Sequence, residues 1–298
     1  MKKRLILMLK KLGLKDSIKR LLRVFNYQKK IIINNIKFKT LQLYGARCKV
    51  EEPFMLKLLK MVFELKKGAF LDVGVNLGQT LIMAKSIDHD RFYVGFEPNP
   101  SCCFYVAELI RINRFEDVLL IPVGLFNRDS IMQLSLYDDD ITNSGGSVIK
   151  DYWSYKKWTV KRSMQVPLFT ITTIRNSIDL PPFDVIKIDV EGAELEVLNS
   201  LQNEIELNKP IIIIEILSAY SKENEIRYER QLQIKKFIER IDYRIIRIIT
   251  NQKEDLVGLQ KIDGFDVNAN PNHSNYILYH FKFESAIDQK FENILISS

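Results

Sequence analysis

Residues 69–78 of the chain read AFLDVGVNLG, and residues 184–194 read DVIKIDVEGAE. Each stretch is a short apolar run that ends in an acidic residue followed by a glycine turn. A parallel strand that is buried on both faces shows this continuous apolar pattern. The two stretches therefore predict the first and fourth strands of a nucleoside-binding α/β sheet.

The loop after the first of these strands predicts a ligand site. Ligands of open α/β sheets bind outside the carboxyl ends of the strands. Gly74 and Gly78 stand where the chain must bend, and glycine permits positive φ and a close approach of the ligand. Glu97 ends the predicted strand at 92–96 and lies 23 residues after Gly74, near the roughly 20-residue offset at which a Rossmann carboxylate meets a ribose hydroxyl. If the ligand is a nucleoside that carries a methionine tail, we expect Asp72 to accept a hydrogen bond from the amino group of that tail.

The spacing of this loop argues against a dinucleotide. The G-x-G-x-x-G fingerprint needs a second glycine beside the pyrophosphate, but Asn76 stands there and Gln79 replaces the third glycine. A side chain at 76 crowds a diphosphate but not a methionine tail. A tight strand-to-helix turn without a ligand is the other interpretation. We predict that S-adenosylmethionine is the cofactor and that it is bound by Asp72, Gly74, Asn76, Gly78 and Glu97.

Later strands end in carboxylates that suit the chemistry of a hydroxyl acceptor. Asp189 ends the fourth strand, Glu191 follows on the same rim, and Glu215 ends the fifth strand. Such groups can act as a base, accept hydrogen bonds from hydroxyls, or hold a divalent cation. For Asp189 and Glu191 the alternative is a helix amino-terminal cap, because a helix follows. We predict Asp189, Glu191 and His273, which precedes the last strand, as catalytic residues, and Lys187 as the partner of a neighbouring acid.

These motifs resemble those of the FkbM family of S-adenosylmethionine-dependent methyltransferases. The resemblance extends over residues 51–282 and is carried by DVGVNLG at 72–78, FEP at 96–98, IKIDVEGAE at 186–194, PIIIIE at 210–215 and NYIL at 275–278. It implies a Rossmann-like class I methyltransferase fold, with a seven-stranded, mostly parallel sheet that ends in an antiparallel hairpin. It also implies O-methylation of a sugar, a polysaccharide precursor or another small polyhydroxylated acceptor.

We expect three regions: an extension at 1–50, a methyltransferase domain at 51–285 and a tail at 286–298. Residues 125–170 form an insertion before the fourth strand, with strands expected near 131–136 and 164–169. The polar tip between them is expected to act as a lid, because long loops in compact domains tend to be functional. Its aromatic residues either stack on sugar rings or anchor the insertion to the domain; they are Tyr152, Trp153, Tyr155 and Trp158.

The positive charge of the chain is concentrated at its amino terminus. The chain has 298 residues and a net charge of +7, but residues 1–30 contain eleven Lys or Arg and one acid, so they carry +10 and the remainder carries −3. This distribution argues against a nucleic-acid substrate, which needs a basic face on the catalytic domain. Residues 1–28 read as basic amphipathic helices that either contact an anionic membrane surface or pack on the domain or on a second subunit.

The apolar run of the amino-terminal segment is too short for a signal peptide or a membrane span. Its apolar run, residues 5–9, has five residues, whereas a secretory signal needs roughly 7–15 and a membrane span needs about 20. The three cysteines have no zinc-binding spacing, which suits a reducing, cytoplasmic compartment. If residues 1–28 contact a membrane, we expect a peripheral location at its inner surface. Two other functions remain open: a nicotinamide-dependent oxidoreductase, and a non-catalytic partner-binding protein on the same fold.

Overall fold

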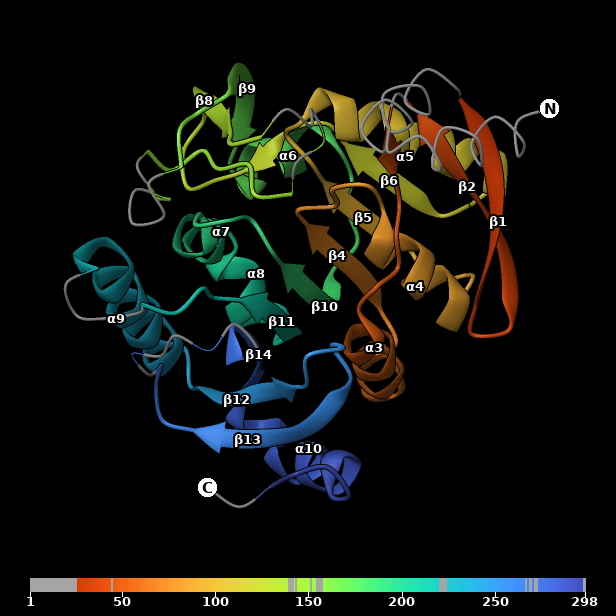
Figure 1. The fold of residues 1–298 in the computed structure, drawn as a ribbon. Coiled ribbons are helices and arrows are strands. Elements are labelled where there is room, and N and C mark those ends of the chain that lie inside the picture. The colour runs from red at the N-terminus through yellow and green to blue at the C-terminus, as the bar shows by residue number, and fades with distance from the viewer. Residues whose placement is uncertain are drawn as a thin grey trace.

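The central sheet of the computed structural model has eight strands, which are, in spatial order, β13 (Leu256–Ile262), β12 (Tyr243–Thr250), β14 (Asn275–His280), β11 (Ile211–Glu215), β10 (Phe183–Ile188), β4 (Ala69–Val73), β5 (Tyr93–Phe96) and β6 (Val118–Ile121) (Figure 1). The structure describes residues 26–43, 45–138, 142, 144–150, 152–153, 158–219, 224–265, 267, 270 and 273–296.

Most strands of this sheet run in one direction. Strands β6, β5, β4, β10 and β11 pair in parallel, and β14 pairs antiparallel with both β11 and β12. The mostly parallel sheet and the antiparallel pairing of its last strands are therefore confirmed. The sheet has one strand more than the seven expected, because β13 pairs antiparallel with β12 at the edge.

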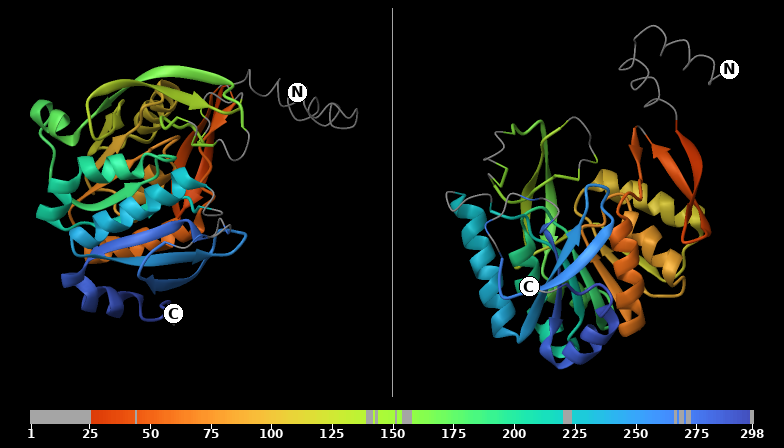
Figure 2. Two further views of the ribbon diagram at one scale, coloured as in Figure 1. Left: turned by 90° about the vertical axis from the view of Figure 1, so that its left-hand side faces the viewer. Right: turned by 60° about the horizontal axis from the view of Figure 1, so that its bottom comes forward.

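Helices cover both faces of the sheet (Figure 2). One face is covered by α3 (Pro53–Leu65), α4 (Gln79–Ile87), α5 (Pro100–Asn113) and α10 (Glu284–Phe291). The other is covered by α6 (Ile171–Ser177), α7 (Glu194–Ser200), α8 (Gln202–Asn208) and α9 (Glu225–Arg240). The short 3₁₀ helix η3 (Phe281–Phe283) leads into α10.

The continuous apolar runs of the central strands are explained by the helices that cover both faces of the sheet. In β11, Ile211 and Ile213 belong to the hydrophobic core beneath one set of helices, whereas Ile212 and Ile214 belong to the core on the opposite face. Successive side chains of a strand point to opposite faces, so a strand between two helix layers has no solvent-facing position. Each such isoleucine contributes about 1.5–3 kcal/mol by burial.

The described part of the amino-terminal extension is a small antiparallel sheet of β1 (Tyr27–Ile33), β2 (Ile36–Leu43) and β3 (Ala46–Arg47). The sheet is fastened to α5 by Tyr105, whose hydroxyl donates to the Leu41 carbonyl at 2.6 Å and accepts from the Cys48 N–H at 2.9 Å. The basic helices expected in residues 1–28 lie almost entirely outside the described residues.

The carboxy-terminal residues pack on the domain. The boundary expected at 285 falls inside α10, where Ile287 and Phe291 are fully buried. Leu295 then forms a bridge with Leu259 of β13. Residues up to 296 therefore belong to the same folded unit as the sheet.

The insertion forms its own three-stranded sheet of β7 (Gly124–Leu125), β9 (Arg162–Phe169) and β8 (Ser130–Leu136). The two strands expected near 131–136 and 164–169 are confirmed as β8 and β9. Tyr152 and Trp153 of the tip are buried, and the guanidinium carbon of Arg227 in α9 lies 4.5 Å and 5.0 Å from their ring centres. These two rings anchor the insertion, whereas Trp158 is 46% exposed and Tyr155 lies outside the described residues.

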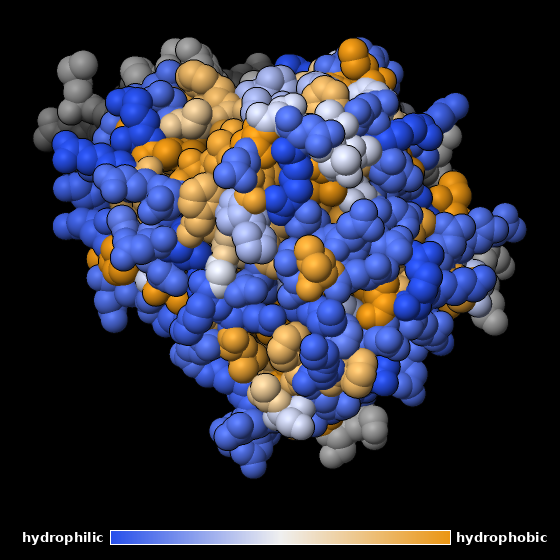
Figure 3. Space-filling model, turned by 180° about the vertical axis from the view of Figure 1, so that it is seen from behind, coloured by the Kyte–Doolittle hydropathy of each residue, from blue (hydrophilic) through white to orange (hydrophobic). Residues whose placement is uncertain are grey.

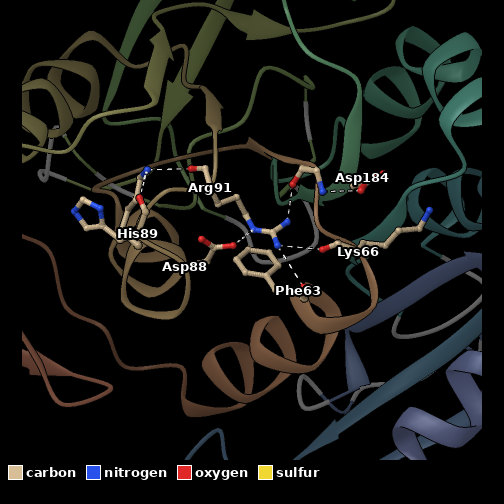
Figure 4. A network of polar contacts seen from close by, with 8 residues as sticks. Phe63, Lys66, Asp88, His89, Arg91 and Asp184 are labelled. Atoms are coloured by element: carbon tan, nitrogen blue, oxygen red, sulfur yellow. Dashed lines mark hydrogen bonds and ion pairs between the residues drawn. The ribbon is translucent and has the colours of Figure 1, made fainter.

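A buried arginine ties together the amino-terminal ends of the strands (Figure 4). Arg91 donates to the Gly68 carbonyl at 2.6 Å, to the Lys66 carbonyl at 3.1 Å and to the Phe63 carbonyl at 3.3 Å. Its Nε bonds Asp88 at 3.2 Å, and its guanidinium lies 3.9 Å from the Phe63 ring centre. The end of α3 is thereby fixed to the starts of β4 and β5, at the end of the sheet opposite the carboxyl ends of the strands.

The surface seen from behind is mostly hydrophilic, with hydrophobic residues in small separate areas, the most continuous of which lies in the upper part of the view (Figure 3). No helix among the described residues is both long and apolar enough to cross a membrane.

Candidate active site

A cleft opens where β4, β5 and β10 end, beneath the insertion. The cavity has a volume of about 220 Å³. The loop after β4 contributes Gly74 and Asn76 to its wall, the end of β5 contributes Glu97, and the turn after β10 contributes Asp189 and Glu191. The insertion contributes Leu134, Leu136, Ser144, Gly146, Val148 and Leu168 to the wall. Of the residues predicted from the two opening motifs, Gly74, Asn76, Asp189 and Glu191 therefore meet at one site.

Gly74 allows two strand ends to come into contact. It has φ of +94°, and a Cβ atom there would lie 1.8 Å from the carbonyl oxygen of Asp189. Only glycine tolerates that approach. Gly78 also has positive φ, at +80°, but it starts α4 and packs against Leu109. It does not line the cleft, and its place at the start of α4 makes it a residue that shapes the loop.

Glu97 is the carboxylate of the cleft whose orientation best suits hydrogen bonds from the hydroxyls of a ribose. Its side chain is 6% exposed. One carboxylate oxygen accepts the backbone N–H of Asn76 and the other accepts that of Asn99, both at 2.8 Å. Burial raises the pKa of Glu97 to about 7, although the two N–H groups act in the opposite direction. Each oxygen keeps a further acceptor position, so the carboxylate can receive two hydroxyl groups.

Asp72 lies behind the wall of the cleft. It is completely buried and is not among the residues that line the cavity. The Tyr93 hydroxyl donates to it at 2.6 Å, and Lys187 Nζ lies 3.5 Å from its other oxygen. Burial raises the pKa of Asp72, and Lys187 lowers it. The expected direct contact with the amino group of a ligand is therefore corrected: Asp72 holds the base of the loop in place.

Lys187 joins Asp72 to the cleft. Its Nζ lies 3.1 Å from the Asp189 carboxylate, which confirms the predicted partnership with a neighbouring acid. Burial lowers the pKa of Lys187, but Asp189, Asp72 and Glu52 together raise it well above its ordinary value. The lysine is thus a permanent buried cation next to the cleft.

Three carboxylates gather on the same rim. Asp189, Glu191 and Glu215 each offer an oxygen, and these oxygens lie within 4.8 Å of one another. Burial, together with the negative charges of the other two, raises the pKa of Glu215 well above its ordinary value, while the Ser274 hydroxyl donates to it at 3.1 Å. Oxygen ligands of this kind suit a hard divalent cation, and they equally suit the hydroxyl groups of an acceptor.

Neither Asp189 nor Glu191 caps a helix, so that alternative is wrong. The helix α7 begins at Glu194, its N-cap is Ala193 and no side chain caps it. The Gly192 N–H instead donates to the Glu194 side chain at 2.7 Å. Glu191 has φ of +52°, and its carbonyl accepts the Ser147 hydroxyl of the insertion at 2.7 Å. The chain thus leaves β10 through a strained turn that the insertion holds.

His273 does not join this cluster. Its Nε2 lies 3.3 Å from Asn270 Nδ2, and the residue lines neither the cleft nor the hollow beside it. The adjacent Ser274 faces Glu215 instead. The predicted role of His273 as a proton acceptor is therefore not compatible with its position.

The cleft also brings in a residue that the sequence pattern does not indicate. Glu52 lines the cleft and two polar hollows beside it, of about 300 Å³ and about 520 Å³. In the sequence it only precedes a helix that starts with Pro53, and a glutamate at such a position is common. It carries no motif from which its place in the cleft can be predicted.

Comparisons with known proteins identify the family of the chain. The family model of the methyltransferase FkbM domain matches residues 72–245. The curated Methyltransferase 1 of Beauveria bassiana (strain ARSEF 2860) is 25% identical over 145 residues, which are 45% of this chain and 58% of that protein. The matched region is therefore less than two thirds of that relative.

Solved structures are similar to the chain as well. The methyltransferase FkbM from Methylobacillus flagellatus KT has a TM-score of 0.45 and 15% identity, covering 71% of this chain and 43% of that chain. An O-methyltransferase from Bacillus cereus in complex with SAH has a TM-score of 0.41 and 14% identity, covering 75% and 78%.

Proposed function

The chain belongs to the FkbM methyltransferase family, and from that premise we propose that it transfers the methyl group of S-adenosylmethionine to a hydroxyl of a sugar, a polysaccharide precursor or a related glycoconjugate. The observation that carries the proposal is the cleft at the carboxyl ends of β4, β5 and β10. In it, a glycine turn brings the loop after β4 against the end of β10, and the buried carboxylate of Glu97 lines the wall where the hydroxyls of a ligand can reach it.

The residues of the cleft fit a nucleoside with a methionine tail. Glu97 can accept both hydroxyls of a ribose, because its two oxygens are oriented by backbone N–H groups. Gly74 lets the loop turn tightly against the Asp189 carbonyl, so the backbone of the loop forms the wall of the cleft along which the tail would lie. The apolar side chains of Phe126, Leu136 and Leu168 offer a surface for a purine. When bound, this ligand supplies a methyl group on a positively charged sulfur.

The acceptor side of the cleft is rich in carboxylates, which supports a polyhydroxylated acceptor. In the proposed reaction Asp189 and Glu191 accept hydrogen bonds from the acceptor and orient one hydroxyl, because carboxylates are strong acceptors without donors of their own. Positioning of this kind supplies much of the rate of a displacement reaction. A divalent cation held by Asp189, Glu191 and Glu215 is the second proposal for the same cluster, since their oxygens lie within 4.8 Å of one another.

The proposal is tested by calorimetric titration with S-adenosylmethionine, its demethylated product and NAD. We expect the first two to bind and NAD not to bind. Changing Glu97→Ala removes two charge-assisted hydrogen bonds to hydroxyls and is expected to weaken binding by roughly 1.5–3 kcal/mol per bond. The matched control is Glu108→Ala, an exposed acid on α5 paired with Arg111, which is expected to leave binding unchanged.

Two outcomes would contradict the proposal. Preferential binding of NAD would favour the nicotinamide-dependent oxidoreductase. Binding of none of the three ligands would favour a non-catalytic partner-binding protein on a methyltransferase fold. If binding is as expected, a screen of methyl glycosides with a radiolabelled methyl donor identifies the acceptor.

A further inference from the structure

Glu52 stands at the start of α3 without serving the helix. Its backbone carbonyl accepts the Met55 N–H at 3.2 Å, but its side chain caps no N–H of the helix. Among the described residues, the Glu52 carboxylate accepts no hydrogen bond and forms no ion pair. The side chain is half-buried. A half-buried carboxylate that makes no contact of this kind within the protein is available to a ligand.

Three hollows meet at this side chain. The cleft of about 220 Å³ suits the methyl donor. The second hollow, of about 300 Å³, lies over the ends of β10 and β11, and the third, of about 520 Å³, lies between β3 and α4. Of the described residues that line these hollows, Glu52 alone lines all three. An acceptor in either side hollow can meet a donor in the cleft only where the hollows join.

The other carboxylates of the cleft, Glu191 included, already interact with groups of the protein. Asp189 is paired with Lys187 at 3.1 Å. Glu215 accepts the Ser274 hydroxyl at 3.1 Å. Glu97 accepts two backbone N–H groups. These contacts occupy acceptor positions on the oxygens of each carboxylate and fix its orientation, so these groups suit binding better than proton transfer.

We propose that Glu52 is the catalytic base of the methyl transfer and receives the proton of the acceptor hydroxyl. The inference rests on the proposed function. In the step, the bond from the acceptor oxygen to the methyl carbon forms as the bond from that carbon to sulfur breaks. The electron pair of the broken bond stays on sulfur, which becomes neutral, and the hydroxyl proton passes to the Glu52 carboxylate.

The surroundings of Glu52 suit this role. Burial raises the pKa of Glu52 to about 7, the Lys187 cation lowers it, and three neighbouring acids raise it; they are Asp189, Glu254 and Asp72. A general base works best when its pKa lies near the operating pH. Glu215, the remaining acid of the second hollow, also faces this region.

The first arm of the test needs no acceptor. S-Adenosylmethionine carries a positive sulfur and its demethylated product does not, so a carboxylate at the transferred methyl group favours the former. We compare the affinities of the two ligands in the wild-type chain, in Glu52→Gln and in Glu254→Gln. Glu254 lines both side hollows but not the cleft, which makes it the matched control.

At pH 8.5, Glu52→Gln is expected to lower the preference for the charged ligand by about tenfold, the effect of one nearby charge at an intermediate dielectric. Glu254→Gln is expected to leave the ratio unchanged. In the wild-type chain, the preference for S-adenosylmethionine over its demethylated product should rise between pH 6 and 8.5. In Glu52→Gln, the same preference should not change with pH. An unchanged ratio in Glu52→Gln would overturn the inference while leaving the proposed function intact. Failure of both ligands to bind the wild-type chain would overturn both.

The second arm uses methyl glycosides of common hexoses and deoxyhexoses with a radiolabelled methyl donor. For any sugar that is methylated, Glu52→Gln is expected to reduce kcat by about 10²–10⁴-fold, with the affinity for the demethylated product unchanged. The wild-type rate should rise through pH 7, and the variant should lose that dependence. A variant that keeps most of the wild-type kcat would show that another group takes the proton.

Discussion

Replacing Lys187 with methionine should destabilise the chain more strongly than any surface substitution. Lys187 is 5% exposed and is the cation that lies between Asp72 and Asp189. Methionine has a similar length and apolar character, so the packing is largely kept. The fully buried Asp72 would lose its cation and keep only the Tyr93 hydroxyl as a partner. Removing one member of a buried ion pair costs about 3–5 kcal/mol.

The loss of unfolding free energy caused by Lys187→Met should be smaller at low pH than at high pH. Burial already raises the pKa of Asp72 above its ordinary value of 3.8, and loss of Lys187 raises it further. The folded variant therefore holds a proton that the unfolded chain releases. The stabilising effect of that proton is fully present below about pH 3.8 and is lost as the pH rises through the folded-state pKa, by at most about 1.4 kcal/mol per pH unit.

Urea denaturation at pH 5.5 and pH 8 measures both effects. Lys187→Met should be less destabilised at pH 5.5 than at pH 8, and the double variant with Asp72→Asn should recover most of the loss. The matched control is Lys67→Met, at an exposed lysine, which should change the unfolding free energy by no more than about 0.5 kcal/mol. A cost below about 1 kcal/mol for Lys187→Met at pH 8, or no recovery in the double variant, would refute the role of this cation.

Four further predictions concern other parts of the structure. Gly74→Ala should cost about 2–4 kcal/mol in thermal or urea unfolding, because its Cβ collides with a backbone oxygen at a positive φ; a cost within error of zero would contradict the close approach. Arg227→Met should expose the insertion to limited chymotrypsin digestion and cost about 1–2 kcal/mol; unchanged cleavage would mean that the two rings hold the insertion without the guanidinium. Chelation of divalent cations with EDTA should leave the calorimetric affinity for S-adenosylmethionine unchanged, since the carboxylate cluster is separate from Glu97; a loss would place a cation in the donor site. Removing residues 1–28 should abolish sedimentation with anionic liposomes, and binding that survives the truncation would argue against a membrane role for this segment.

Much of the fold follows from patterns that are local in the sequence. Continuous apolar runs predict the central strands, because those strands are covered on both faces. The bend after β4 is predicted by its glycines, and the strands of the insertion are predicted by their spacing. The strand β13 is not predicted, since it lies at an edge where Gln260 and Lys261 interrupt the apolar pattern.

The site is predicted less completely, because its contacts join distant segments. Asp72 and Lys187 are opposite one another through the parallel pairing of β4 and β10, and that register is not visible in either stretch alone. Because of this register, Asp72 is the partner of Lys187 and not the direct ligand contact that the sequence predicted. Glu52 reaches the cleft only through the packing of α3, and the position of His273 depends on a loop whose path the sequence does not specify.

The position of β14 has a consequence for how the chain folds as it is synthesised. It lies between β11 and β12, yet it is made after both of them and after β13. Until it arrives, β11 and β12 each present an unpaired edge of a largely isoleucine strand. Exposed edges of this kind are templates for intermolecular pairing. We therefore expect the nascent chain to depend on chaperones during that interval, and the Ser274 contact to Glu215 in the cleft to form only at its end.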